Sequence, residues 1–254
     1  MSFLEMVFIE FKKVKRSKIL PLILIPPLLV VISGISSLSQ YLSDESEGVW
    51  SAMFVQCGLL FSYYLLPFSM VVVCVMISQR EIQNNGILKM LALPIQHKKL
   101  ALSKLVVVLC YLALEVVLFF SIFVISGIMA TQMLDINEAF PIGYILKWSV
   151  YLFATAIPFT TVIWMITVLF RKPLFSIGLN MLFIIPGVLV ANTSAWLIYP
   201  YCYGGYLIST ELERVSLGAA EETFEFFPFI PCAIAIFLVA LIITVQRFGK
   251  KEMK

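Results

Sequence analysis

Several kinds of residue that build metal and nucleotide sites are scarce in this chain. Of its 254 residues, one is a histidine and five are cysteines, and only 13% are charged. No two cysteines have C-x-x-C spacing, so a zinc or haem site has almost no ligands to draw on. The cysteines are interpreted as small apolar packing residues. The chain also lacks a G-x-x-x-x-G-K-[ST] phosphate loop, so any process driven by ATP would need another chain to bind the nucleotide.

Long apolar runs dominate what is present. Hydrophobic residues make up 61% of the sequence, and its mean hydropathy is +1.00. A soluble domain of this length would need far more polar surface to cover its core, whereas about 20 predominantly apolar residues cross a bilayer as a helix. The sequence therefore predicts an all-α integral membrane protein with one transmembrane domain over 1–254. Its six predicted spans are Ile19–Leu38, Met53–Ser78, Lys104–Ala130, Ile142–Phe170, Leu174–Tyr199 and Pro228–Gln246.

Basic residues indicate which side of the membrane each segment occupies. Nearly all of the 18 lysines and arginines lie in the N-terminal segment, in the connections after spans two and four, and in the C-terminal tail. With six spans these four segments share one side, and the excess of positive charge assigns that side to the cytoplasm. Both termini are therefore predicted to be cytoplasmic. Acidic residues gather in the three connections on the other side, which include the outer loop 200–228.

The first 18 residues combine a helical apolar stripe with a basic cluster. Apolar side chains recur at spacings of three and four from Phe3 to Val14, and basic residues continue to Lys18. This pattern predicts an amphipathic helix over 1–18 that lies in the inner membrane interface, with its cations toward anionic headgroups. The alternative is a plain cytoplasmic extension of the first span.

The segment 79–104, QREIQNNGILKMLALPIQHKKLALSK, is unusually polar for its position between two apolar spans. Its first residues, QREIQNNG, can break or cap a helix. A short apolar patch that includes Leu91 and Leu93 follows, and Pro94 ends it. Two helices can be joined by only a few residues, so this longer connection is predicted to be a structured element on the cytoplasmic side. An exposed apolar patch there would contact the bilayer surface or a protein partner.

This segment resembles the inner loop of ABC exporter permeases of the second type. The family pattern is an acidic residue, a glycine, a leucine-rich piece, a proline and a basic residue that enters span three. The matching positions here are Glu81, Asn85, Gly86, Leu91, Leu93, Pro94, Lys98 and Lys104. The sequence NGILKMLALPI is most similar to that of the permeases of lantibiotic self-protection transporters. The interfacial helix, the six spans, the cytoplasmic termini and the longer loop before span six extend the resemblance to the whole chain.

The resemblance implies a particular assembly and function. Permeases of this family act as dimers with two cytoplasmic ATPases that bind ATP and Mg²⁺, so no cofactor is expected in this chain. The second permease would be an identical copy or a similar chain. The interfacial helix and the coupling helix within 79–104 would form the contact surface for the ATPases. The implied function is the export of a lantibiotic or similar cationic antimicrobial peptide from the cell membrane of a Gram-positive bacterium, with no catalytic residues in this chain and no nucleic-acid partner.

Two other functions stay open at this point. The first is an ABC permease for another antibiotic, a lipid or a glycan. The second is a membrane protein that binds or senses a ligand without transporting it. The acidic outer face would attract cationic peptides, but outer loops that lack lysine and arginine for topological reasons would have the same composition.

Glu115 stands near the middle of the third predicted span. An ionisable residue at that depth is energetically costly, which makes Glu115 a candidate for the substrate path or for coupling to helix movement. The alternative is a protonated carboxyl group that is hydrogen-bonded to a neighbouring helix. The sequence alone supports both.

Overall fold

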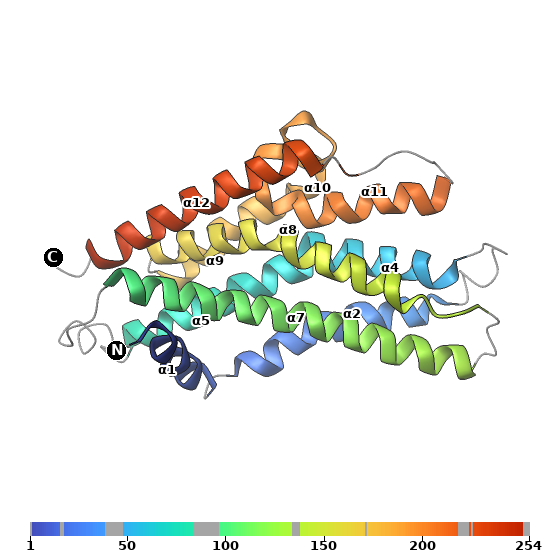
Figure 1. Ribbon diagram of the computed structural model, residues 1–254, viewed down its shortest axis with the longest axis horizontal. Helices are drawn as coiled ribbons and strands as arrows, with labels where there is room; N and C mark the ends of the chain where they lie inside the picture. The colour runs from blue at the N-terminus through green and yellow to red at the C-terminus, as the bar shows by residue number, and fades with distance from the viewer. Residues whose placement is uncertain are drawn as a thin grey trace.

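The structure of this chain is a computed structural model. It describes residues 2–15, 18–38, 48–83, 97–133, 138–170, 172–217, 224 and 226–250. Every regular element within these ranges is a helix, and the helices form one elongated bundle (Figure 1). Six helical segments are long and apolar enough to cross a membrane. The predicted all-α architecture with six candidate spans is therefore confirmed.

The spans follow one another along the chain. They are α2 (Ile19–Ser36), α4 with η1 and α5 (Val49–Leu60, Phe61–Leu65 and Leu66–Gln83), α7 (His97–Met133), α8 (Ile142–Leu169), α9 with α10 (Pro173–Ile184 and Gly187–Ala191) and α12 (Phe226–Lys250). The third span begins at His97, earlier than the predicted Lys104, because its basic first turns extend the helix beyond the apolar run. The fifth ends at Ala191 rather than Tyr199, because the chain turns at Asn192 and continues as a 3₁₀ helix; Pro186 separates the two helical parts of this span.

The helices on both sides of residues 84–96 are longer than a bilayer requires. α7 has 37 residues and therefore extends over about 55 Å, whereas the hydrocarbon core of a membrane is about 30 Å thick. The second span has 32 residues within its apolar segment. Parts of both helices must consequently project beyond the hydrocarbon region or tilt strongly within it.

The connection between the fifth and sixth spans contains a helix that apolar runs do not reveal. Two 3₁₀ helices, η2 (Ser194–Ile198) and η3 (Pro200–Cys202), lead into α11 (Tyr203–Leu217). α11 packs against α4 and runs along the bundle (Figure 1). It has only 15 residues and a charged second half. An average of hydropathy over the length of a membrane span therefore does not detect it. The predicted outer loop 200–228 is thus partly helical.

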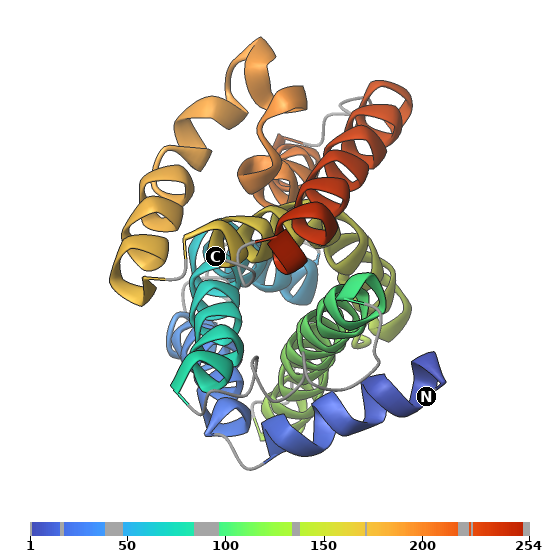
Figure 2. The same ribbon diagram turned by 90° about the vertical axis from the view of Figure 1, so that its left-hand side faces the viewer.

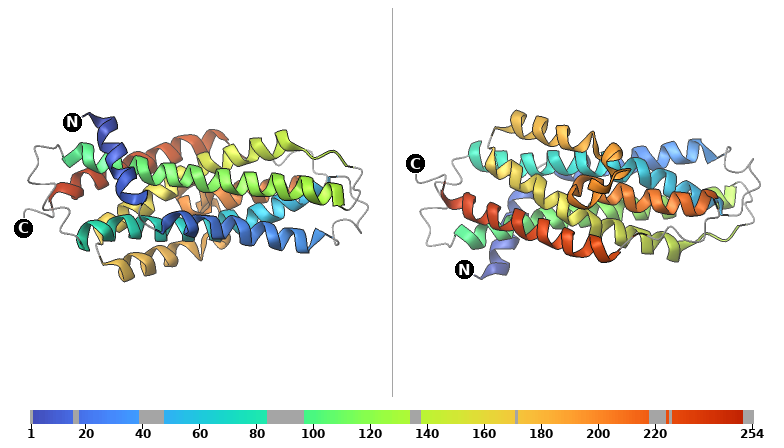
Figure 3. Two further views of the ribbon diagram at one scale, coloured as in Figure 1. Left: turned by 90° about the horizontal axis from the view of Figure 1, so that it is seen from below. Right: turned by 90° about the horizontal axis from the view of Figure 1, so that it is seen from above.

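α1 (Phe3–Lys15) lies across one end of the bundle (Figure 2, Figure 3). The start of α7 and the end of α12 lie at the same end (Figure 1). Met6, Glu10 and Val14 are spaced four residues apart and are buried against the bundle. Phe3, Leu4, Phe8 and Ile9 expose their apolar side chains on other sides of the helix.

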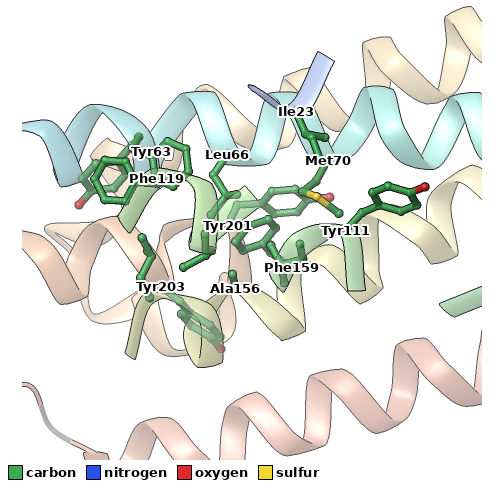
Figure 4. Close-up of a cluster of buried hydrophobic side chains, with 14 of the residues drawn as sticks. Ile23, Tyr63, Leu66, Met70, Tyr111, Phe119, Ala156, Phe159, Tyr201 and Tyr203 are labelled. Atoms are coloured by element: carbon green, nitrogen blue, oxygen red, sulfur yellow. The ribbon is translucent and has the colours of Figure 1, made fainter. Parts of the chain in front are cut away.

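Aromatic side chains fill the middle of the bundle (Figure 4). Phe61 of η1 stacks on Phe119 of α7 with ring centroids 4.4 Å apart. Phe159 of α8 lies against Tyr201 of η3 at 6.4 Å, and the Tyr201 hydroxyl donates to Asn180 Oδ1 at 2.9 Å. The connection that follows the fifth span is therefore part of the core.

A π-helical turn, η1, interrupts the second span directly before Pro67. A proline has no N–H for the i−4 hydrogen bond and its ring crowds the preceding turn, so a widened turn accommodates it. Tyr63 of this turn lies against α11, where Gly205 leaves room for the tyrosine ring. A Cβ atom at position 205 would overlap that ring.

Gly205→Ala is therefore expected to destabilise the protein by about 1–3 kcal/mol, because the Tyr63 ring and its turn would have to move. Gly178→Ala is the matched control, since nothing lies within 4 Å of its added Cβ atom. Thermal unfolding of the purified proteins measures both effects. Equal midpoints for the two variants would show that the Tyr63 ring moves aside without cost.

Candidate functional site

An ion pair fixes α1 to the beginning of α7. Glu10 Oε2 and Lys104 Nζ are 2.7 Å apart, although 94 residues separate them in the chain. Both side chains are buried, and that of Lys104 is completely removed from solvent. Lys13, one turn after Glu10, contacts the other carboxylate oxygen at 2.6 Å. One carboxylate on α1 thus faces two ammonium groups.

Arg80 attaches the same helix to the end of α5. Its guanidinium group donates a hydrogen bond to the main-chain carbonyl oxygen of Lys13, in the last turns of α1. We call Glu10, Lys13, Arg80 and Lys104 the α1 charge cluster. Since α5 and α7 are the helices that flank residues 84–96, the cluster links α1 to both ends of that segment.

The charges of the cluster determine the protonation of Glu10. Burial alone would raise the pKa of this carboxyl group, but the ammonium groups of Lys104 and Lys13 outweigh burial and hold the pKa below its ordinary value of 4.5. Glu10 is therefore a carboxylate at neutral pH. Removing one partner of this buried pair would leave an uncompensated charge, which is strongly destabilising.

A second polar contact lies deep inside the bundle. Glu115 of α7 is fully buried, and its two carboxyl oxygens are 2.5 Å and 2.7 Å from Ser69 Oγ of α5. Ser69 Oγ is also 2.9 Å from the carbonyl oxygen of Leu66. A serine hydroxyl has a single hydrogen. Two hydrogen bonds are formed if a protonated Glu115 donates from one oxygen to Ser69 Oγ while Ser69 donates to the Leu66 carbonyl, and the second carboxyl oxygen then lies beside Ser69 without a hydrogen of its own.

That contact is a bridge between two helices that otherwise pack elsewhere. α5 packs mainly on α8 and α9, and α7 packs mainly on α8, α2 and α1. The Ser69–Glu115 contact joins α5 and α7 within the bundle, and the α1 charge cluster joins them at its end. α5 and α7 are therefore connected at two levels along the bundle axis.

Most of the predicted coupling residues fall outside the described part of the chain. This holds for Asn85, Gly86, Leu91, Leu93 and Pro94. Glu81 lies in the last turn of α5, and its side chain is likewise outside the description. Lys98 is exposed in the first turn of α7. Among these residues the structure therefore shows no mutual contact that could be assigned to a site.

Sequence reasoning missed Glu10 and Ser69. A sequence signal for Glu10 does exist, because it stands four residues from both Met6 and Val14 and so interrupts an apolar helical stripe. The structure shows that all three residues are buried. No comparable signal marks Ser69, because serine is common in membrane helices and its partner lies 46 residues away. Among the described residues, no group of three or more His, Cys, Asp or Glu side chains is placed to hold a metal ion.

Six candidate spans in one bundle, with a charged helix across its end, define a multi-pass membrane protein. A family model described as ABC-2 family transporter protein matches residues 6–187, which includes most of α1 and the first five spans up to the start of α10. The chain belongs to this family and is a membrane permease, a non-catalytic subunit of an ABC-2 type transporter. Such permeases generally act with an ABC ATPase. No curated protein and no solved structure matches the chain.

Proposed function

We propose that this permease belongs to an exporter whose ATPases bind at the α1 end of the bundle, and that its substrate is a lantibiotic or a similar cationic peptide. In this proposal the α1 end and both termini face the cytoplasm. The start of α7, the start of α9 and the end of α12 lie at that end together with α1 (Figure 1). Lys98, Lys172 and Arg247 belong to these helix ends. This distribution of positive charge supports the orientation.

The observation that carries the proposal is the Glu10–Lys104 ion pair. It attaches α1 to α7, and Arg80 attaches α1 to α5. An ATPase that presses on residues 79–104 would therefore displace α1 and both flanking helices together. Closure of the ATPases would reach the membrane as a movement of one rigid body, in the way that domain closure is commonly transmitted.

The membrane interface is the proposed location of α1. Leu4 and Phe8 expose large apolar side chains, and the Lys12 ammonium lies 4.6 Å above the Phe8 ring. A helix that exposes apolar residues beside cations is suited to the boundary between acyl chains and anionic headgroups. The buried stripe with Glu10 at its centre would meanwhile hold α1 against the permease.

The substrate assignment rests on the resemblance of the 79–104 segment to lantibiotic self-protection permeases. That resemblance also places the protein in the cell membrane of a Gram-positive bacterium. The permease would pair with a second copy or with a similar six-span chain. The spans α2, α9 and α12 expose many apolar side chains, which suits contact with lipid or with that second permease.

Affinity capture of the tagged chain from its native membranes tests the assembly. We expect a cytoplasmic protein with a phosphate loop to copurify, alone or with a second six-span chain. Disruption of the gene is expected to make the cells more susceptible to at least one lantibiotic, and reintroduction of the intact gene is the control. Copurification of an ATPase, combined with unchanged peptide susceptibility after gene disruption, would refute the proposed substrate. Capture without any nucleotide-binding protein, in a detergent that preserves known transporters, would refute the exporter.

A further inference from the structure

A cavity of about 300 Å³ lies between α8, α11 and the start of α12, away from the α1 end of the bundle (Figure 1). Its walls are aromatic on two sides. Trp148 and Tyr151 of α8 form one side, and Phe224 and Phe226 next to and within α12 form the other. Polar residues of α11 close it. The cavity is not used by the coupling mechanism proposed above.

Among the described residues that line this cavity, one is a carboxylate, and it is already paired. Glu211 is buried and accepts a hydrogen bond from the Tyr144 hydroxyl at 2.7 Å. It also accepts from Arg214 Nε at distances of 2.9 Å and 3.0 Å to its two oxygens. Arg214 keeps about half of its side chain exposed (51%). The Glu211 charge is thus neutralised inside the cavity, while part of the guanidinium group stays accessible.

Lys147 adds a second cation at the opening of the cavity. Its ammonium lies 5.8 Å from the ring centroid of Trp148 and 5.7 Å from that of Tyr151, within the range of cation–π attraction. Within the part of the chain that the structure describes, Lys147 makes no ion pair. Among the described residues that line the cavity, the Arg214 charge balances that of Glu211, and Lys147 adds one positive charge. This net positive charge favours an anionic group and repels a cationic one. The aromatic faces that would attract a cationic ligand are already occupied by the lysine.

The position of the cavity indicates where that anion comes from. Lys147 lies in the second turn of the fourth span, and Phe226 is the first residue of the sixth. Leu146, Val150 and Phe227 expose apolar side chains around them. The cavity is therefore located where two apolar spans begin, at the level that headgroups occupy in a bilayer.

We propose that this cavity binds a phospholipid, with the headgroup phosphate between Lys147 and Arg214 and the adjoining apolar part of the lipid on the aromatic walls. Charge-assisted contacts from both cations would hold the phosphate oxygens. Only the choice of leaflet rests on the function proposed above: with the α1 end in the cytoplasm, the lipid belongs to the outer leaflet.

Native mass spectrometry of the full-length protein, purified in mild detergent with any chains that accompany it, tests the site. We expect the parent to retain a phospholipid and Lys147→Gln to retain about fivefold less, the ratio expected when one partly exposed ion pair is lost. Lys147→Arg is expected to retain the lipid. Lys172→Gln, at the other end of the bundle, is the matched control and is expected to behave as the parent does.

Equal lipid retention in the parent and Lys147→Gln would overturn the proposal. A bound mass of inorganic phosphate in place of a phospholipid would also overturn it, because the aromatic walls would then have no ligand. These outcomes are independent of the proposed export function. Gene disruption tests export through peptide susceptibility, and Lys147→Gln tests the cavity through lipid retention. Unchanged susceptibility would refute only the export proposal, and unchanged lipid retention would refute only the lipid site.

Discussion

Glu10→Gln is expected to destabilise the protein by about 3–5 kcal/mol, since it removes the negative charge that faces the buried ammonium of Lys104 at 2.7 Å. Lys104→Met is expected to cost less, because Lys13 still neutralises the Glu10 carboxylate. The double variant Glu10→Gln/Lys104→Met should lose less stability than the two single variants lose together, because residues in contact do not act independently. Thermal unfolding of the purified variants measures these differences.

Glu5→Gln is the matched control, because Glu5 lies on the same helix but is exposed and contacts only the main chain at Ser2 in the described part of the chain. If the proposed coupling is correct, Glu10→Gln also lowers the ATPase stimulation by substrate in the assembled complex, whereas Glu5→Gln does not. Identical unfolding midpoints for the two variants would show that the ion pair does not hold α1 in place.

The same ion pair predicts how stability changes with pH. The pKa of Glu10 is lower in the folded protein than its ordinary value of 4.5, so the unfolded chain binds the proton more readily. The stabilisation by Glu10 is then fully present above about pH 4.5 and is lost as the pH falls through the folded-state pKa. Glu10→Gln lacks this contribution. The difference in stability between parent and variant should therefore shrink on acidification and stay constant near neutrality.

Ser69→Ala is expected to destabilise the protein by about 1–3 kcal/mol, because it leaves the carboxyl group of Glu115 buried without its hydrogen-bond partner. Adding Glu115→Leu to Ser69→Ala should restore much of that stability, since the unsatisfied buried carboxyl group is then removed as well. Ser103→Ala is the matched control. Ser103 is also fully buried, and in the described part of the chain its hydroxyl donates within its own helix, to the Leu100 carbonyl at 2.8 Å.

Glu115→Gln separates the two interpretations of this residue. Glutamine can still donate a hydrogen bond to Ser69 but cannot lose a proton. Export at the parental rate would show that Glu115 acts as a neutral hydrogen-bonding group between helices. Loss of export in a variant of unchanged stability would instead assign it a role in the substrate path or in coupling.

Equal stability of Ser69→Ala and Ser103→Ala would exclude a structural role for the contact between Ser69 and Glu115.

The six spans could be predicted because the bilayer imposes a length and an apolar composition that a single sequence displays directly. The predicted boundaries were displaced where another effect decided them, as at His97, where basic turns prolong the helix, and at Asn192, where the chain turns into a 3₁₀ helix. α11 was missed since no membrane-scale pattern marks it. The family resemblance indicated the class of protein, and the family match confirms that class.

The contacts between distant residues could not be predicted in the same way. The burial of Glu10 depends on Lys104, which becomes its neighbour only after the bundle has formed. Ser69 and Glu115 likewise meet through packing that hydropathy does not encode. The coupling role of residues 84–96 and of Glu81 stays a prediction, and so does the substrate.

The geometry of α7 has a consequence for how the permease can move. Glu115 is the middle residue of this 37-residue helix, and no proline interrupts it, whereas α2, α8 and α12 each contain at least one proline in their interior. In the proposed coupling, α1, α5 and α7 move as one rigid body, and the Ser69–Glu115 contact lies at the middle of its longest helix. If that body turns about this level, a displacement at Lys104 reaches Met133 with its direction reversed, so that one side of the bundle opens as the other closes.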